Sequence, residues 1–307
     1  MMNMKRFLNM FLSIVVLAIV FTSCDWLFPY SLEDAPAPAA KPNPEPEPNT
    51  DPKPVDTLAF SIGDGKYVYL SPGNLQYHAN LKQWRFAPNQ YDYIGSANKN
   101  ISSNYNGWID LFGWGTGNNP TEYSVSEENY SLYIDWGFNK IGDDEPETWR
   151  TLTSGEWGYM IKSRINASSL RGAACLLLED GGQVIGWILL PDNWETPTSI
   201  TFQHGCSNGY STNVIREEKW KLMEAKGAIF LPAAGYRDGK YSSNPVEAVQ
   251  VEGCYWTSSV SNDYYYKGAA MFLRLTFDAF FYGACYTESG YYRHVGHSVR
   301  LAKDVVL

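Results

Sequence analysis

Two motifs enclose the stretch that decides the fold: Gly253-Cys254-Tyr255-Trp256-Thr257-Ser258-Ser259 and Gly296-His297-Ser298-Val299-Arg300-Leu301. Apolar residues alternate with polar ones at Tyr255–Ser259, Met271–Phe277 and Ser298–Leu301. Alternation of this kind is typical of strands with one buried face. We therefore expect three scaffold strands here, with the residues between them displayed at the surface.

The residues between these strands are rich in Tyr, Asn, Asp, Ser and His. This composition resembles that of a paratope, because Tyr provides a large contact area at a low entropy cost. We expect the ligand-binding residues to be Asn262, Asp263, Tyr264, Tyr265, Asp278, Phe280, Tyr282, Tyr286, Ser289, Tyr291, Tyr292 and His294.

Upstream of this stretch, the pattern predicts a mixture of strands and two helices. Gly63-Asp64-Gly65 lies between two strand-like runs and predicts a hairpin. Thr153 and Glu156 form a capping box that starts a helix ending near Arg164. A second helix is expected from about 215 to 225, and a buried strand at 184–190. Two helices among many strands indicate an α+β fold with long loops.

The N-terminal residues predict an export signal and a lipid anchor. Lys5-Arg6 precede an apolar run from Phe7 to Phe21, which is shorter than the roughly 20 residues needed to span a bilayer. The run leads into Phe21-Thr22-Ser23-Cys24, which resembles a bacterial lipobox. We expect 1–23 to be a lipoprotein signal peptide and Cys24 to carry the lipid. The alternative is an ordinary secretory signal with an incidental cysteine.

A proline-rich segment separates this anchor from the rest of the chain. Residues 35–56 alternate proline with small and acidic residues and cannot form a core. We therefore expect 24–57 to be the lipidated terminus and a disordered stalk, and 58–307 to be one ligand-binding domain. The net charge of −9 argues against a nucleic-acid partner.

Six short motifs occur in an order that resembles a known family. They are Trp84–Ala87, Trp108–Thr116, Leu189–Trp194, Phe230–Arg237, Tyr255–Ser259 and Gly296–Leu301. This set is similar to Bacteroidetes surface lipoproteins related to the Fibrobacter succinogenes major paralogous (FISUMP) domain. That group resembles a branch of the C-type-lectin-like fold shared with formylglycine-generating enzymes. The resemblance covers about 58–304.

The resemblance implies a C-type-lectin-like domain with two helices and a small twisted antiparallel sheet. It also implies that the first and last strands pair, so that 67–70 would lie near 298–301. Some proteins of this superfamily are variable proteins of diversity-generating retroelements, rewritten in a C-terminal segment. The composition of 262–297 fits such a segment. A fixed aromatic hairpin fits it equally well, and both interpretations stay open.

The sequence lacks several motifs that an enzyme or a metal site of this kind would need. The paired C-terminal cysteines of formylglycine-generating enzymes are absent, and Trp256 is followed by Thr-Ser-Ser rather than by a calcium motif of classical lectins. His294 and His297 have no obvious further metal ligand in sequence. We expect no catalytic residues, no metal and no cofactor, although a glycosidase carboxylate pair distant in sequence stays open.

Besides Cys24, the chain has Cys175, Cys206, Cys254 and Cys285. Exported proteins can form disulfides, but sequence does not rank the pairings. A Cys254–Cys285 bond is attractive because both residues lie in the C-terminal stretch. Buried thiols are the alternative.

The sequence thus predicts a ligand-binding lipoprotein of the outer membrane that faces the cell exterior. Its segment at about 254–297 would present an aromatic face to a protein or glycan ligand. One alternative is a non-diversified adhesin, or a fimbrial or envelope component. The other is an enzyme of the formylglycine-generating or carbohydrate-active kind.

Overall fold

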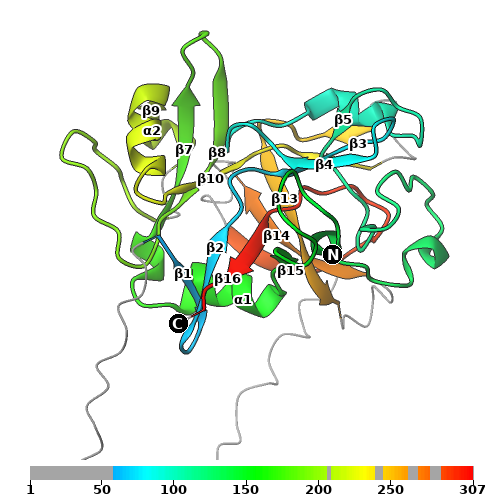
Figure 1. The fold of residues 1–307 in the computed structure, drawn as a ribbon. Coiled ribbons are helices and arrows are strands. Elements are labelled where there is room, and N and C mark those ends of the chain that lie inside the picture. Colours follow the sequence, from blue (N-terminus) through cyan, green and yellow to red (C-terminus); the bar gives the residue numbers. More distant parts are fainter. Residues whose placement is uncertain (1–57, 206–208, 239–244, 262–268, 277–284, 307) are drawn as a thin grey trace, which may run out of the picture. The chain divides into compact units, whose positions relative to one another are not determined.

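The computed structural model describes residues 58–205, 209–238, 245–261, 269–276 and 285–306, with the backbone alone for 285–290. The chain divides into two units, 1–51 and 52–307, and every described residue belongs to the second. Within the described ranges, two α-helices lie among strands that form five small sheets (Figure 1). The fold is therefore α+β, as predicted. None of the described helices is long and apolar enough to cross a membrane.

One sheet joins the two ends of the described domain. Its strand order is β1 (Phe60–Gly63), β2 (Lys66–Leu70), β16 (Leu301–Asp304) and β6 (Arg150–Thr151). The register pairs Ala302 with Leu70, and the amide of Ser71 donates to the carbonyl of Leu301 over 2.8 Å. The predicted proximity of 67–70 to the last strand is confirmed, but β16 pairs with the second strand, β2, and not with the first strand, β1. The strand β16 begins only at Leu301, however, so the expectation of a strand over Ser298–Leu301 needs correction.

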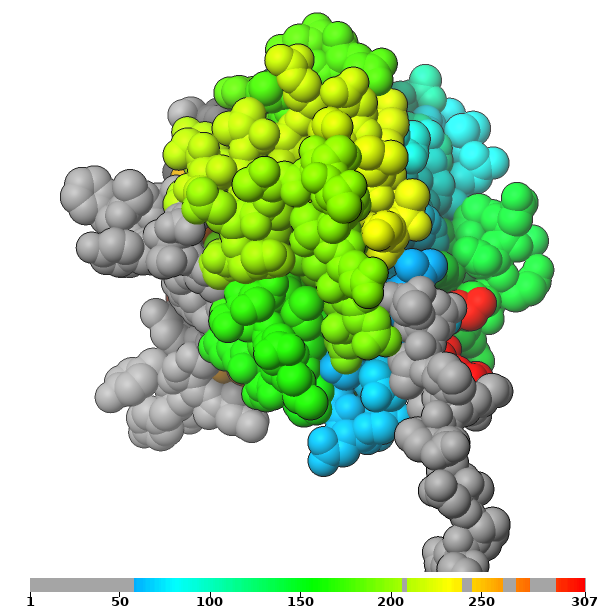
Figure 2. Space-filling view, turned by 90° about the vertical axis from the view of Figure 1, so that its left-hand side faces the viewer, coloured from blue at the N-terminus to red at the C-terminus, as the bar shows by residue number. Residues whose placement is uncertain are grey.

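A second sheet lies on another side of the domain and carries the second helix. Its order is β10 (Ile229–Pro232), β8 (Gln183–Leu189), β7 (Arg171–Leu177) and β9 (Val214–Arg216), followed by α2 (Glu217–Glu224). Trp220 and Met223 of α2 pack into a core cluster with Phe230 and Ile188. Residues of this sheet region cover most of the face seen in Figure 2. Because β7 and β9 run parallel, this sheet is mixed, unlike the small antiparallel sheet that was expected.

The first helix forms where the capping box predicts it. In α1 (Ser154–Gly158), the Thr153 hydroxyl accepts from the Glu156 amide, and the Glu156 carboxylate accepts from the Thr153 amide. The helix continues as a π-helical turn over Tyr159–Ser163 and is capped by Arg164. Trp157, Met160 and Ile161 face the largest core cluster. The spacing of apolar residues therefore identified the buried face correctly.

The stretch that opens the sequence analysis forms a three-stranded antiparallel sheet. Its order is β13 (Glu252–Val260), β14 (Ala270–Thr276) and β15 (Cys285–Tyr291). Tyr255, Leu273 and Leu275 face one core cluster, whereas Cys254, Trp256 and Phe272 face another. The predicted strand at 255–259 is confirmed, and the one predicted at 271–277 is confirmed up to Thr276, where the described segment ends. The sequence did not predict β15, because its residues were assigned to the displayed surface.

The remaining elements are short and surround long packed loops. They are β3 (Leu75–His78), β4 (Gln83–Phe86), β5 (Trp108–Ile109), β11 (Tyr236–Arg237), β12 (Val246–Glu247), and 3-10 turns at Gly95–Asn100, Glu127–Tyr130, Trp136–Phe138, Ala167–Ser169 and Tyr210–Thr212. Trp114 and Trp136 are almost completely buried in these loops. The Gly-Trp alternation thus marks packed irregular backbone, as expected.

A buried carboxyl group holds one of these loops in place. Asp110 accepts from the Ile94 amide over 2.8 Å and from the Asn98 side chain over 2.7 Å. Burial raises the pKa of Asp110 to about 6, although these hydrogen bonds act in the opposite direction. The Asn98 side chain in turn accepts from the amides of Asp110 and Leu111. This network replaces regular secondary structure as the partner of the loop backbone.

The sheet register argues against a Cys254–Cys285 disulfide, one of the two alternatives that the sequence left open. Cys254 is the partner of Arg274, and Cys285 is the partner of Leu275, so two strand spacings separate the cysteines. These spacings place the Cα atoms about 10 Å apart, beyond the roughly 7 Å that a disulfide tolerates. Cys175 is a buried thiol whose pKa is raised by burial. Cys206 lies outside the described residues.

Candidate ligand-binding pocket

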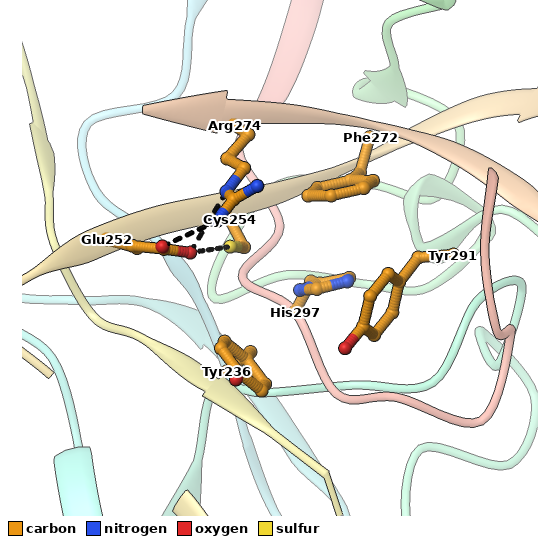
Figure 3. A pocket seen from close by; sticks show the side chains of 7 residues that line it. All are labelled: Tyr236, Glu252, Cys254, Phe272, Arg274, Tyr291 and His297. Atoms are coloured by element: carbon orange, nitrogen blue, oxygen red, sulfur yellow. Dashed lines mark hydrogen bonds and ion pairs between the residues drawn. The ribbon is translucent and has the colours of Figure 1, made fainter. Parts of the chain in front are cut away.

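A pocket of about 100 Å³ opens on one face of the β13–β14–β15 sheet. Figure 3 shows the Glu252–Arg274 pair on one side of it, Tyr291 on the other and His297 between them. The described residues that line it are Tyr236, Glu252, Cys254, Phe272, Arg274, Tyr291 and His297.

The period of two along the strands explains how this lining is assembled. Successive side chains of a strand point to opposite faces, so Glu252 and Cys254 share one face of β13. The register places Arg274 opposite Cys254, and Phe272 opposite Trp256, on that same face. The intervening residues fill the core on the other side. An ordinary alternating strand pair therefore directs two polar and two apolar side chains into one pocket.

The polar side of the pocket is an ion pair between neighbouring strands. The Arg274 guanidinium donates to the Glu252 carboxylate through Nη2 over 2.6 Å and through Nε over 3.1 Å. The pair is diagonal, since the register partner of Glu252 is Thr276. The Arg274 side chain is 32% exposed and the Glu252 side chain 18%, so both remain accessible from the pocket. Two parallel hydrogen bonds of this kind fix the orientation of the guanidinium relative to the carboxylate.

His297 is the most buried polar residue of the lining, at 1% exposure. Its ring stacks on Phe272 with centroids 4.8 Å apart and meets Trp256 edge-on at 4.3 Å. Burial, and then the positive charges of Arg237 and Arg274, lower the pKa of His297 to about 3. The imidazole is therefore neutral at physiological pH. Neither ring nitrogen has a hydrogen-bond partner among the described residues.

Two tyrosines complete the aromatic side. Tyr236 and Tyr291 have ring centroids 6.4 Å apart at an interplanar angle of 63°, and both rings lie near His297. The Tyr236 hydroxyl donates to Glu247 over 3.2 Å. Burial is the main cause that raises the pKa of each tyrosine, so both phenols stay protonated. The two tyrosine rings and the His297 ring thus form the aromatic side of the pocket, opposite the Glu252–Arg274 ion pair.

Several predicted ligand-binding residues lie outside the described part of the chain. These are Asn262, Asp263, Tyr264, Tyr265, Asp278, Phe280 and Tyr282. The predicted signal peptide, Cys24 and the stalk also lie there. Tyr286 and Ser289 are described as backbone positions of β15, where Tyr286 pairs with Arg274. These two residues therefore lie in a strand that the sequence did not predict.

The structure separates the remaining predicted residues into two groups. Tyr291 lines the pocket. Tyr292 is 53% exposed and stacks on His294, with ring centroids 5.5 Å apart. His294 Nδ1 lies 2.8 Å from Glu127 Oε1. The two histidines weighed as a metal clamp therefore have different surroundings, and the described residues contain no cluster of three or more His, Cys, Asp or Glu suited to a metal.

Sequence reasoning did not assign Tyr236, Glu252, Phe272 or Arg274 to a site. One signal was present: Arg274 is a charged residue inside the apolar run Met271–Phe277. A charge in such a strand marks a face that is not core. No comparable signal pointed to Tyr236, which reaches the pocket from a distant hairpin.

Comparison with protein-family models, with curated proteins and with solved structures found no match for this chain.

Proposed function

We propose that this protein is a surface-displayed ligand-binding lipoprotein with a C-type-lectin-like domain. Cys24 would carry the lipid, and the proline-rich stalk would hold the domain away from the outer membrane on its exterior side. The ligand is a protein or a glycan. The sequence motifs quoted above and the pairing of β2 with β16 support this assignment.

The observation that carries the binding role is the pocket on the β13–β14–β15 sheet. Most of its lining belongs to the C-terminal stretch that the sequence singles out, including Tyr291, which was predicted to bind ligand. A concave site with aromatic walls and a few fixed polar groups is typical of ligand recognition.

The same geometry argues for binding rather than catalysis. A general base works best when its pKa lies near the operating pH. The pKa of His297 is about 3, so its imidazole is too weak a base for that role. The Glu252 carboxylate is held in a two-point ion pair. We therefore retain the enzyme reading only as the weaker alternative.

The lipid anchor is tested by metabolic labelling with a radioactive fatty acid. Wild-type protein should incorporate label and sediment with membranes. The C24A variant should incorporate none, because the acyl acceptor is missing. Equal labelling of the two chains would refute the anchor.

The binding role is tested on printed arrays of glycans and of purified proteins, using the full-length protein in detergent. We expect specific binding that falls at least tenfold in the double variant Y236A/Y291A, because two walls of the pocket are removed. The matched control is Y210A, since Tyr210 is 37% exposed and lies on a 3-10 turn away from the lining. Array binding that survives in Y236A/Y291A would show that the pocket is not the binding site.

A further inference from the structure

The charges on the pocket wall select against charged ligands. The Glu252 carboxylate is already paired with Arg274 by two hydrogen bonds. A cation entering the pocket meets the positive charge of Arg274, which belongs to the lining. An anion meets the carboxylate of Glu252. The pocket is therefore best matched to a group without net charge.

The ion pair nevertheless offers both kinds of hydrogen bond side by side. Arg274 supplies N–H donors, and Glu252 supplies acceptor oxygens. A hydroxyl group donates and accepts at once, so neighbouring hydroxyls can bond to both members without breaking the pair. A protonated amine can only donate to Glu252, and a carboxylate can only accept from Arg274. This pattern favours a ligand that carries several hydroxyl groups.

The opposite side of the pocket requires an apolar surface on the same ligand. Tyr236, Tyr291 and Phe272 present aromatic carbon, and His297 lies between them with both nitrogens lacking a partner among the described residues. A saturated sugar ring has C–H groups on its face and hydroxyls around its edge. It can therefore pack against the rings while its edge reaches the ion pair.

The size of the pocket limits how much of the ligand enters. Its volume is about 100 Å³. Sites that enclose a whole drug-sized ligand measure roughly 300–1,000 Å³. This pocket therefore holds one ring, and the rest of a larger ligand stays outside it. The terminal residue of a glycan chain can enter in this way, with the rest of the glycan outside the pocket.

We propose that the pocket binds one uncharged sugar ring at the end of a glycan, packed against Tyr291 and Tyr236 and hydrogen-bonded through its hydroxyls to Glu252 and Arg274. The inference rests on the binding role proposed above and narrows its ligand class. The competing occupant is an aromatic side chain of a protein, which fits the rings but offers at most one hydroxyl to the ion pair.

Saturation-transfer NMR on the full-length protein in detergent separates these occupants. The probes are the methyl glycosides of neutral hexoses and, as the competing class, the N-acetyl amides of tyrosine and phenylalanine. We expect at least one glycoside to receive saturation and the amides to receive none. In E252Q the affinity for that glycoside should fall about tenfold, because a hydrogen bond to a charged acceptor is weakened.

Conservative variants keep this test independent of folding. Y291F retains the ring and should bind the glycoside, whereas Y291A should not. Y210A is the control and should bind like wild type. Variants are compared only where the melting temperature is within a few degrees of wild type, and E252Q and Y291F are the ones expected to meet that condition.

The outcomes distinguish the two proposals. Saturation of an aromatic amide but of no glycoside overturns the sugar assignment and leaves the pocket as a binding site for protein. If neither class binds and Y236A/Y291A leaves array binding unchanged, both the sugar assignment and the binding role of the pocket fail. Glycoside binding that is equal in wild type, Y291A and E252Q places the sugar elsewhere and also overturns the inference.

Discussion

Replacing Arg300 with alanine is expected to lower the free energy of unfolding by at least about 4 kcal/mol. The Arg300 side chain is almost completely buried, and burial lowers its pKa to about 10, so it is still charged at neutral pH. Its guanidinium donates to the carbonyls of Ser71, Gln90 and Phe230. These carbonyls belong to segments far apart in sequence, and R300A leaves all three without their donor.

Chemical denaturation of wild type and two further variants measures this effect. R300K keeps the charge but lacks the planar fork, and its stability should lie between those of wild type and R300A. The control R216A also removes an arginine, but Arg216 is exposed, so the change should stay within about 0.5 kcal/mol. If R300A is as stable as R216A, the three carbonyls do not depend on the guanidinium.

The second large effect is expected for G235A. Gly235 has φ of +73°, and a Cβ atom there would lie 2.1 Å from the carbonyl oxygen of Glu247. Left-handed backbone costs a non-glycine residue roughly 1–2 kcal/mol, and overpacking adds about 1–3 kcal/mol. We expect a loss of about 2–5 kcal/mol from these two terms together. Since Tyr236 follows directly, ligand binding should be lost as well.

Gly142 provides the matched control for that prediction. It has φ of +58°, but no atom lies within 4 Å of the position that a Cβ would take. G142A should therefore show only the backbone cost of roughly 1–2 kcal/mol. Thermal unfolding of both variants measures their losses of stability, and the difference between them is the cost of the close contact with the Glu247 carbonyl. Equal losses in G235A and G142A would mean that the close approach of the Glu247 carbonyl costs nothing.

Both predictions concern residues of two of the six short sequence motifs. Gly235 lies in Phe230–Arg237, and Arg300 lies in Gly296–Leu301. The structure explains why each residue type is needed. At Gly235 the turn leaves no room for a Cβ atom, and at Arg300 the buried guanidinium donates hydrogen bonds to three separate segments. These motifs therefore build the scaffold that carries the pocket, and only Tyr236 and His297 of the two motifs line it.

The candidate site was only partly predictable. Tyr291 was expected to bind ligand and does line the pocket, but its neighbour Tyr292 stacks on His294 instead. The composition of a segment indicates contact surface without saying which side chain faces which way. In β15, direction is set by pairing with β14, and that register includes an irregularity between Ala270 and Phe272. A bulge changes which residues share a face, and sequence alternation does not reveal it.

The sequence by itself determined the local elements of this protein. The Thr153–Glu156 capping box starts α1, the Gly63–Gly65 turn closes the β1–β2 hairpin, and the alternation in β13 and β14 separates two faces. Each depends on residues a few positions apart. Only the tertiary structure decided the pocket, because Tyr236 and His297 reach it from outside the three-stranded sheet. Such contacts depend on how distant segments close on one another, which the spacing of nearby residues does not encode.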